Sequence, residues 1–207
     1  MGMVLGITQL DDRTIERLVA DPPLVWLVVA GDDREQYERA RQDERRLQKP
    51  GLIARLFGAA RPAPPPPADA PPFALGDGEG KEIDVDKSWH GMHYLLTRSA
   101  EAGTPPLDFL LEGGRTVGDE DVGYGPAWVF TAAETRGIAA AVAAISDEEL
   151  RARYDPRAMD AADVYPSLIW VRDGDEALDY VMEYIAILRG TLAEAVEMNR
   201  GLMLTLT

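Results

Sequence analysis

A run of prolines divides this chain and limits which segments can share secondary structure. Residues 61–72 contain seven of the fifteen prolines in a sequence of 207 residues. Proline has no backbone N–H and a fixed φ, so such a run forms polyproline II or an irregular segment rather than a helix or a sheet. Glycine-containing sequence follows as far as residue 80. We therefore interpret residues 49–81 as a flexible Pro/Gly-rich insert, preceded by a charged helix at residues 34–48.

Strand-like and helix-like patterns lie on both sides of the insert. Short apolar stretches predict strands, and capping residues followed by apolar positions three and four apart predict helices. The predicted strands are at residues 4–8, 127–130 and 202–206, and helices are predicted at residues 13–20, 87–99 and 131–144, in a short segment after residue 146, and in a long segment before residue 201. The apolar segment at residues 24–30 is too short for its type to be predicted. We expect one compact α+β domain over residues 1–207, with several helices packed on a small sheet that includes the N- and C-terminal strands, paired with each other.

The predicted helix starts share a side chain that can accept a hydrogen bond from a free backbone N–H. These residues are Asp86, Thr131, Ser146, and either Asp173 or Asp175. At Thr131 and Ser146 a glutamate follows three residues later, which predicts two capping boxes. The long helix has the clearest apolar periodicity, and Gly201 fits its end.

Charge and composition exclude several classes of function. The formal net charge is −15, so duplex nucleic acid and anionic membranes are poor partners, whereas a basic protein is a suitable one. The chain has no cysteine, which excludes disulfides and thiolate sites and suits a reducing compartment. Because no secretion signal is visible either, we expect a cytoplasmic protein. Residues 34–61 depart from the acidic balance with eight basic and four acidic residues, as expected for a solvated helix face or for an arm that docks on an acidic partner.

Several motifs resemble the YfbM-like family, a bacterial family described as a domain of unknown function. The resemblance covers about residues 1–30 and 82–207. Its motifs are the start MGM, DVDKSWHGMHYLLT at 84–97, GYGPA at 123–127, LRARYD at 150–155, VYP at 164–166, and the helix at 180–188. The resemblance implies a single α+β domain and no particular activity. The charged and proline-rich stretch departs from the shortest members of the family, which implies that the fold does not need it.

The two histidines of the chain, His90 and His93, are candidate functional residues. Residues three apart on a helix lie on roughly the same face. With Asp84, Asp86 or the acidic cluster at 119–121, they could supply the ligands of a metal site. However, two imidazoles without a thiolate match no recognised zinc pattern, so we predict no metal and no cofactor.

The histidines also have a structural interpretation, which we favour. One imidazole near a helix start can bond to a backbone carbonyl while Trp89 packs in the core. A third interpretation makes Trp89, His90 and Gly91 a nucleotide-stacking corner, but that likeness extends over only two residues.

The glycine-bearing loop at residues 115–126 is the second candidate. Its glycines allow close backbone approach, so the loop could bind a small ligand or act as a lid. It lacks the known phosphate-cradling patterns, and we favour a purely structural role for this loop over ligand binding. Together with the helix, it completes the set of candidate ligand-binding residues: Trp89, His90, His93, Arg115, Asp119 and Tyr124.

Two hypotheses of function follow from these patterns. The first is a non-enzymatic protein-binding domain of the adaptor or immunity type, because the chain is acidic and contains no catalytic signature. The second is a small-molecule-binding protein or enzyme, with a pocket between the 86–99 helix and the 115–126 loop and a histidine as base or ligand. The position of the two histidines relative to that loop discriminates between them.

Overall fold

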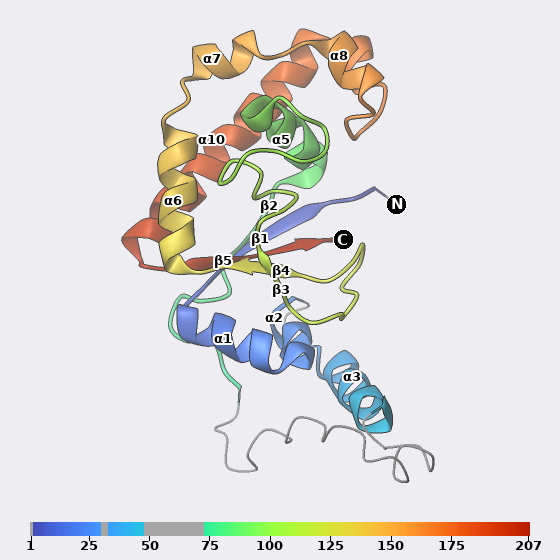
Figure 1. The fold of residues 1–207 in the computed structure, drawn as a ribbon, viewed down its shortest axis with the longest axis vertical. Helices are drawn as coiled ribbons and strands as arrows, with labels where there is room; N and C mark the ends of the chain where they lie inside the picture. The colour runs from blue at the N-terminus through green and yellow to red at the C-terminus, as the bar shows by residue number, and fades with distance from the viewer. Residues whose placement is uncertain (1, 30–32, 48–72) are drawn as a thin grey trace.

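The computed structural model describes residues 2–29, 33–47 and 73–207, and a five-stranded antiparallel sheet organises them (Figure 1). The strands lie in the order β2-β1-β5-β4-β3, so the C-terminal strand is central. Their bounds are β1 Leu5–Leu10, β2 Glu82–Asp84, β3 Arg115–Thr116, β4 Trp128–Phe130 and β5 Gly201–Leu206. The predicted pairing of the first strand with the last is confirmed, with Leu5 opposite Leu206 and Leu10 opposite Gly201.

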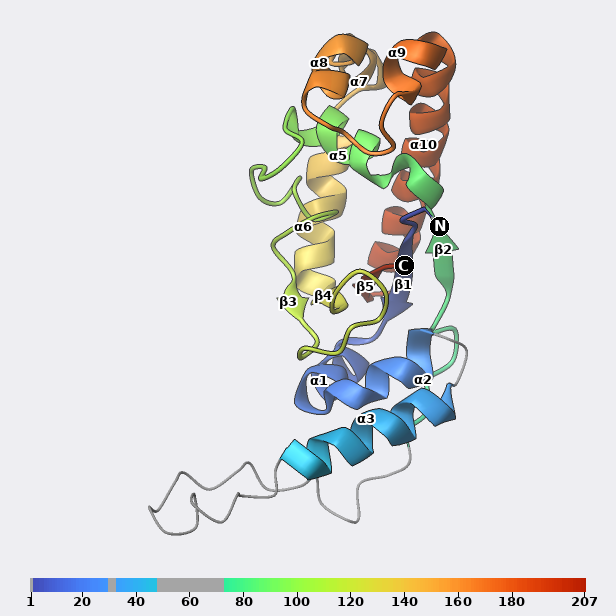
Figure 2. The same ribbon diagram turned by 90° about the vertical axis from the view of Figure 1, so that its right-hand side faces the viewer.

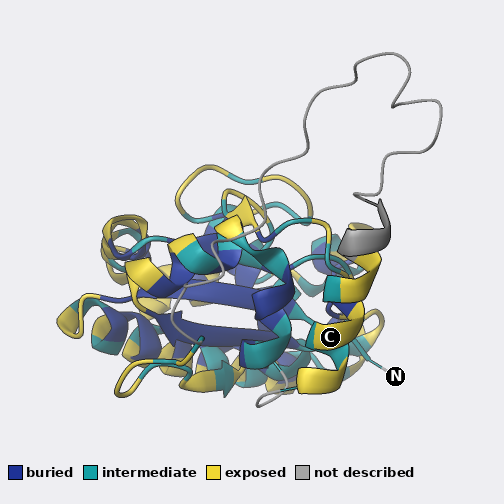
Figure 3. Ribbon diagram, turned by 90° about the horizontal axis from the view of Figure 1, so that it is seen from below, coloured by how far each residue is buried: buried dark blue, intermediate teal, exposed yellow. Residues whose placement is uncertain are grey.

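Both faces of this sheet are buried, which explains why its central strands read as almost continuous apolar runs. Side chains alternate between the faces along each strand. One face carries Leu5, Ile7, Phe130, Leu202 and Leu204, and the other carries Leu10, Val129 and Met203. Figure 3 shows the buried strands in dark blue between helices whose outer surfaces are exposed.

The larger core lies between the sheet and the helices drawn above it in Figure 1. These helices are α5 Trp89–Thr97, α6 Ala132–Ala143, α7 Asp147–Ala152, α8 Pro156–Ala161, α9 Ile169–Asp173 and α10 Asp175–Glu197. The predicted apolar face of the long helix is confirmed, because its residues at three- and four-residue spacing from 178 to 192 are buried in this core. The fully buried Trp170 of α9 packs here too.

A second, smaller core covers the opposite face of the sheet (Figure 2). It is closed by α1 Asp12–Ala20, the 3-10 helix η1 Pro22–Val25 and α2 Trp26–Val29, with α3 Arg34–Leu47 beside them. The short apolar segment of undecided type is therefore helical as far as residue 29. The charged helix predicted at 34–48 corresponds to α3, which the structure describes as far as residue 47, and residues 49–72 of the predicted insert lie outside the described residues.

Helix starts follow local rules at some positions and not at others. The capping box at Thr131 is confirmed: its Oγ1 accepts the Glu134 N–H, and the Glu134 carboxylate accepts the Thr131 N–H. At the second predicted capping box only one bond forms: Ser146 accepts the Glu149 N–H at the start of α7, while the Glu149 carboxylate pairs with Arg153.

Two predicted caps are wrong. Asp86 has φ 47° and begins the 3-10 turn η2 Asp86–Ser88 that precedes α5, because its carboxylate accepts the Tyr180 hydroxyl instead of a helical N–H. α10 starts after Gly174, whose φ of 54° suits glycine, and no aspartate side chain caps it. Gly201 does not end this helix but begins β5, where a Cβ would lie 2.2 Å from the Phe130 carbonyl oxygen.

Within the described part of the chain, no helix has the length and apolarity that a bilayer span requires.

Candidate functional site

His90 is held by backbone groups on both ring nitrogens. Its Nδ1 accepts the Tyr165 N–H at 2.9 Å, so Nε2 carries the proton and donates to the Ala100 carbonyl at 2.6 Å. The ring stacks on Trp89, with centroids 4.9 Å apart and planes 6° from parallel. Burial lowers the pKa of His90, against the raising effect of the Ala100 carbonyl. This imidazole is neutral and ties α5 to two loops.

His93 is fully buried one turn further along α5. Its Nε2 lies 2.8 Å from the Glu101 carbonyl and donates to it, which leaves Nδ1 as a lone-pair acceptor without a hydrogen-bond partner. Burial is the main cause that lowers the pKa of His93, while the carboxylate of Asp108 opposes it. Among the described residues, no three histidine or acidic side chains gather closely enough to hold a metal ion.

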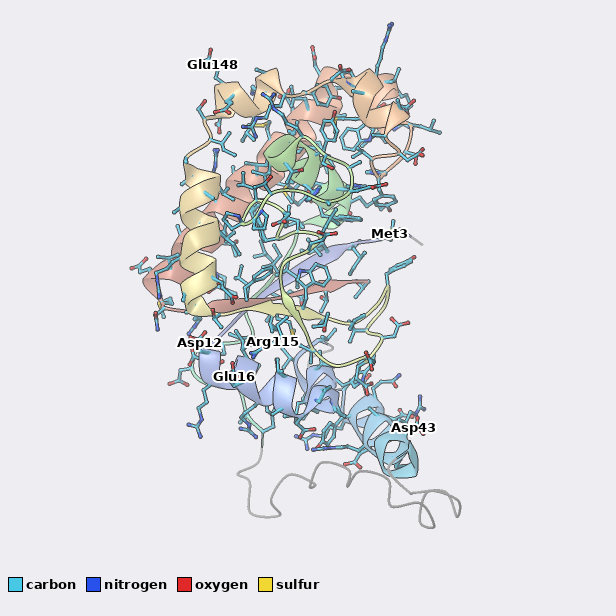
Figure 4. All side chains as sticks on the ribbon, viewed as in Figure 1. Met3, Asp12, Glu16, Asp43, Arg115 and Glu148 are labelled. Atoms are coloured by element: carbon cyan, nitrogen blue, oxygen red, sulfur yellow. The ribbon has the colours of Figure 1, made fainter. Side chains whose placement is uncertain are left out.

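The 115–126 loop is held by its own contacts and by the α1–α2 layer. Arg115 pairs with Glu16 of α1 at 2.7 Å, and both side chains are visible near the sheet edge in Figure 4. Asp121 accepts the N–H groups of Gly123 and Gly125, each at 3.0 Å. Those hydrogen bonds lower the pKa of Asp121.

The structure does not bring the two sets of candidate residues together. Trp89 and its helix neighbours belong to the larger core, whereas Val117 and Val122 of the loop belong to the smaller core on the other face of the sheet. Asp119 is exposed, and Tyr124 is 53% exposed at the end of the loop. The sheet therefore separates the 86–99 helix from the loop that was expected to form a pocket with it.

A different surface combines features typical of recognition sites. Two tyrosines of α10, Tyr180 and Tyr184, pack edge to face with ring centroids 5.1 Å apart, and the Tyr180 hydroxyl donates to Asp86 at 2.8 Å. Carboxylates from η2, α9 and α10 and that of Asp84 lie near the pair, and Glu82 follows next along the edge strand β2, with its side chain on the Gly6 side of the sheet. We call this set the acidic tyrosine face: Glu82, Asp84, Asp86, Asp173, Glu176, Tyr180, Glu183 and Tyr184.

The protonation of these groups reflects an excess of negative charge. Burial, and then the charge of Asp84, raises the pKa of Glu82. Burial and the hydrogen bond to Asp86 raise the pKa of Tyr180, and partial burial together with Asp86, Asp84 and Glu183 raises that of Tyr184. Each shift disfavours further negative charge, as expected where carboxylates outnumber the cations that face them.

A cleft of about 230 Å³ opens on this face beside Tyr180. Pro166, Ile169 and Ala177 supply apolar walls, and the charged residues that line it are Lys87, Asp173 and Glu176. Asp173 is already paired with Arg172, which leaves Glu176 as the free carboxylate at the margin among the described residues. An apolar cleft with a carboxylate at its margin suits the stem and charged head of a lysine or arginine side chain. The sequence analysis missed this face because the partners of α10 come from residues 82–86, about ninety positions earlier in the chain. The signal was the repeat of Glu176, Tyr180 and Tyr184 at four-residue spacing on the polar side of the helix.

The fold and this surface define a class: a three-layer α+β domain with a sheet between two helical layers and an acidic face on one edge. Comparison with known proteins then identifies the family. The sequence profile of the family described as "Domain of unknown function (DUF1877)" matches residues 1–205, and the chain belongs to this family.

A solved structure extends this result to the fold. The chain is similar to the crystal structure of YfbM from Escherichia coli, a protein of unknown function, with a TM-score of 0.60, 13% sequence identity and 99% of each chain covered. None of the curated proteins compared with the chain matches it. The resemblance to the YfbM-like family is thus confirmed for the family and the fold.

Proposed function

We propose that this protein is a non-enzymatic binding domain of the adaptor or immunity type, and that its acidic tyrosine face binds a basic segment of a partner protein. The observation that carries the proposal is the clustering of five carboxylates near two tyrosines, with Glu82 next along the adjoining edge strand. Tyrosine is enriched among residues that dominate binding energy, and complementary charge steers association and selects the partner. The net charge of −15 adds long-range attraction for a basic molecule.

The sheet edge beside this face suits an extended partner. β2 is the edge strand. From Lys81 to Val85 the residues that bond to β1 are odd-numbered: the Val85 N–H donates to Leu5, and the Lys81 carbonyl accepts from Gln9. The backbone groups of Glu82 and Asp84 therefore point away from β1. A basic segment can add there as a strand, with its cationic side chains over the carboxylates and one of them in the cleft beside Tyr180. Because a chain without cysteine needs no oxidising compartment, we expect this interaction in the cytoplasm.

The test measures binding of a short labelled peptide of alternating lysine and valine by fluorescence anisotropy. The variant E82Q/D84N/E176Q/E183Q removes four charges from the acidic tyrosine face. The matched control E112Q/D119N/E148Q/E197Q removes four charges from exposed carboxylates elsewhere. We expect the face variant to weaken peptide binding at least about tenfold, and the control variant to change it by less than about threefold, since only the first set contacts the peptide.

Two further measurements separate site binding from general attraction. Binding to the wild-type protein should weaken as salt rises, and a peptide of alternating glutamate and valine should not bind. Equal losses in the two variants would show that only net charge matters and would contradict the proposed site.

A further inference from the structure

A groove lies on the opposite edge of the sheet from the acidic tyrosine face. It has a volume of about 270 Å³ and is lined by Pro105, Pro106, Phe109, Phe130 and Ile138, with Asp108 among them. The two phenylalanine rings meet edge to face with centroids 6.3 Å apart. The lining comes from the 105–113 segment, β4 and α6, so the groove shares no residue with the proposed protein-binding face.

Asp108 is the polar group of this groove that the protein itself does not satisfy. Its residue is only 4% exposed, and no donor among the described residues makes a hydrogen bond to its carboxylate. Only its backbone carbonyl is used, by the N–H groups of Leu111 and Glu112. Neither oxygen of the carboxylate is fully enclosed, so the group faces the solvent of the groove. A carboxylate in a lined groove that makes no hydrogen bond to the described residues can accept hydrogen bonds from a ligand.

The lining of the groove presents a carboxylate and two aromatic rings. His93 does not line it: the imidazole is fully buried, although the Asp108 carboxylate acts on it electrostatically. Glu134 at the margin adds charge, although its Oε2 is engaged in the α6 capping box.

These features select the chemistry of the ligand. An ammonium group supplies donors to a carboxylate and is attracted to the faces of aromatic rings. Prolines, phenylalanines and an isoleucine suit an apolar body attached to that ammonium. A neutral molecule would leave the buried charge uncompensated, and an anion would be repelled by it.

We propose that this groove binds a small primary amine with an aromatic or branched apolar body, whose ammonium group bonds to Asp108. The occupant is a free small molecule rather than a lysine of a protein, because two phenylalanines and two prolines match a broad apolar body better than an unbranched stem. The site is independent of the acidic tyrosine face.

The probe is 2-phenylethylamine, titrated into the full-length protein while ¹H–¹⁵N spectra are recorded. We expect saturable shifts in the backbone signals of residues 108–113, 137 and 138, with a dissociation constant on the order of 1 mM for so small a ligand. The neutral analogue 2-phenylethanol and Asp108→Asn should each weaken binding at least about tenfold, because both remove one member of the charged hydrogen bond.

Two glycines provide a variant and its matched control. Gly137 follows Glu134 on the groove-facing side of α6, and a Cβ there meets no atom within 4 Å. Gly137→Leu should therefore obstruct the groove without disturbing the core, and we expect it to abolish the shifts. Gly190→Leu, at an equally open position on α10, should leave them unchanged.

Thermal unfolding of Asp108→Asn gives a readout that a structural role would not share. Because the carboxylate lacks a partner, the unliganded variant should melt at the same temperature as the wild-type protein or higher, while losing the amine. A clear drop in melting temperature would assign Asp108 to the fold and overturn the proposal. So would equal binding of 2-phenylethanol, an absence of saturable shifts, or tighter binding of butylamine, which would assign the groove to a lysine side chain.

Discussion

Two imidazoles one turn apart on α5 differ from free histidine because backbone groups and the core, rather than solvent, surround them. His90 uses both nitrogens, and His93 uses one. Their spacing could be predicted from the sequence, and so could a backbone carbonyl as partner. The particular acceptors, Ala100 and Glu101, could not, because they belong to a turn that only the packed chain folds back onto the helix.

We predict that both imidazoles titrate below 6.5, the ordinary histidine pKa from which burial lowers the pKa of each. As pH falls through that value, the unfolded chain takes up protons that the folded chain resists, so the free energy of unfolding decreases. Well above pH 6.5 both imidazoles are neutral in either state and the histidines cause no such loss. The measurement is an NMR titration of the two ring Cε1 signals, assigned with His93→Gln. A midpoint above 6.5 for either ring would contradict the burial argument.

At the scale of elements, the sequence predicted a helix start correctly where all the residues that form the capping hydrogen bonds lie in one short segment. The Thr131 and Glu134 pair is such a case, because both capping bonds close within four residues. The caps predicted for Asp86 and for Asp173 or Asp175 failed for the opposite reason. The hydroxyl of Tyr180, ninety-four positions away, donates a hydrogen bond to the Asp86 carboxylate. A glycine with positive φ, rather than an aspartate, precedes the first residue of α10.

We predict that Thr131→Ala destabilises the protein by about 1 kcal/mol, because it removes the side chain that caps α6. The midpoint of urea unfolding measures this, provided that the m value stays constant. Thr104→Ala is the control, since Thr104 is an exposed loop residue whose side chain makes no hydrogen bond to the described residues. Its effect should stay within about 0.5 kcal/mol. Equal losses at both positions would argue against a capping role.

At the scale of the whole molecule, the main electrostatic feature is an excess of negative charge. The net charge of −15 opposes compaction, and the ion pairs at the surface, such as Arg115 with Glu16, are worth little individually. Salt therefore screens more repulsion than attraction.

We predict that the melting temperature rises when NaCl increases from about 0.01 M to about 0.1 M, which shortens the Debye length from about 30 Å to about 10 Å. Differential scanning calorimetry at pH 7.5 measures the change. The variant E82Q/D84N/E176Q/E183Q, with four fewer negative charges, should respond less to salt. A melting temperature that falls with salt in the wild-type protein would mean that ion pairs outweigh the net repulsion.

The sequence by itself determined the α+β class, the apolar face of the long helix, the capping box of α6 and the pairing of the two terminal strands. Each of these depends on periodicity, on residues within one turn, or on apolar strands that have to be buried. Only the tertiary structure decided that the 86–99 helix and the 115–126 loop lie on opposite faces of the sheet, and that Tyr180 meets Asp86. It also decided that Asp108 is buried in a groove without a donor. Such contacts join residues far apart in the chain, and no local pattern encodes them, because they exist only once both cores have closed around the sheet.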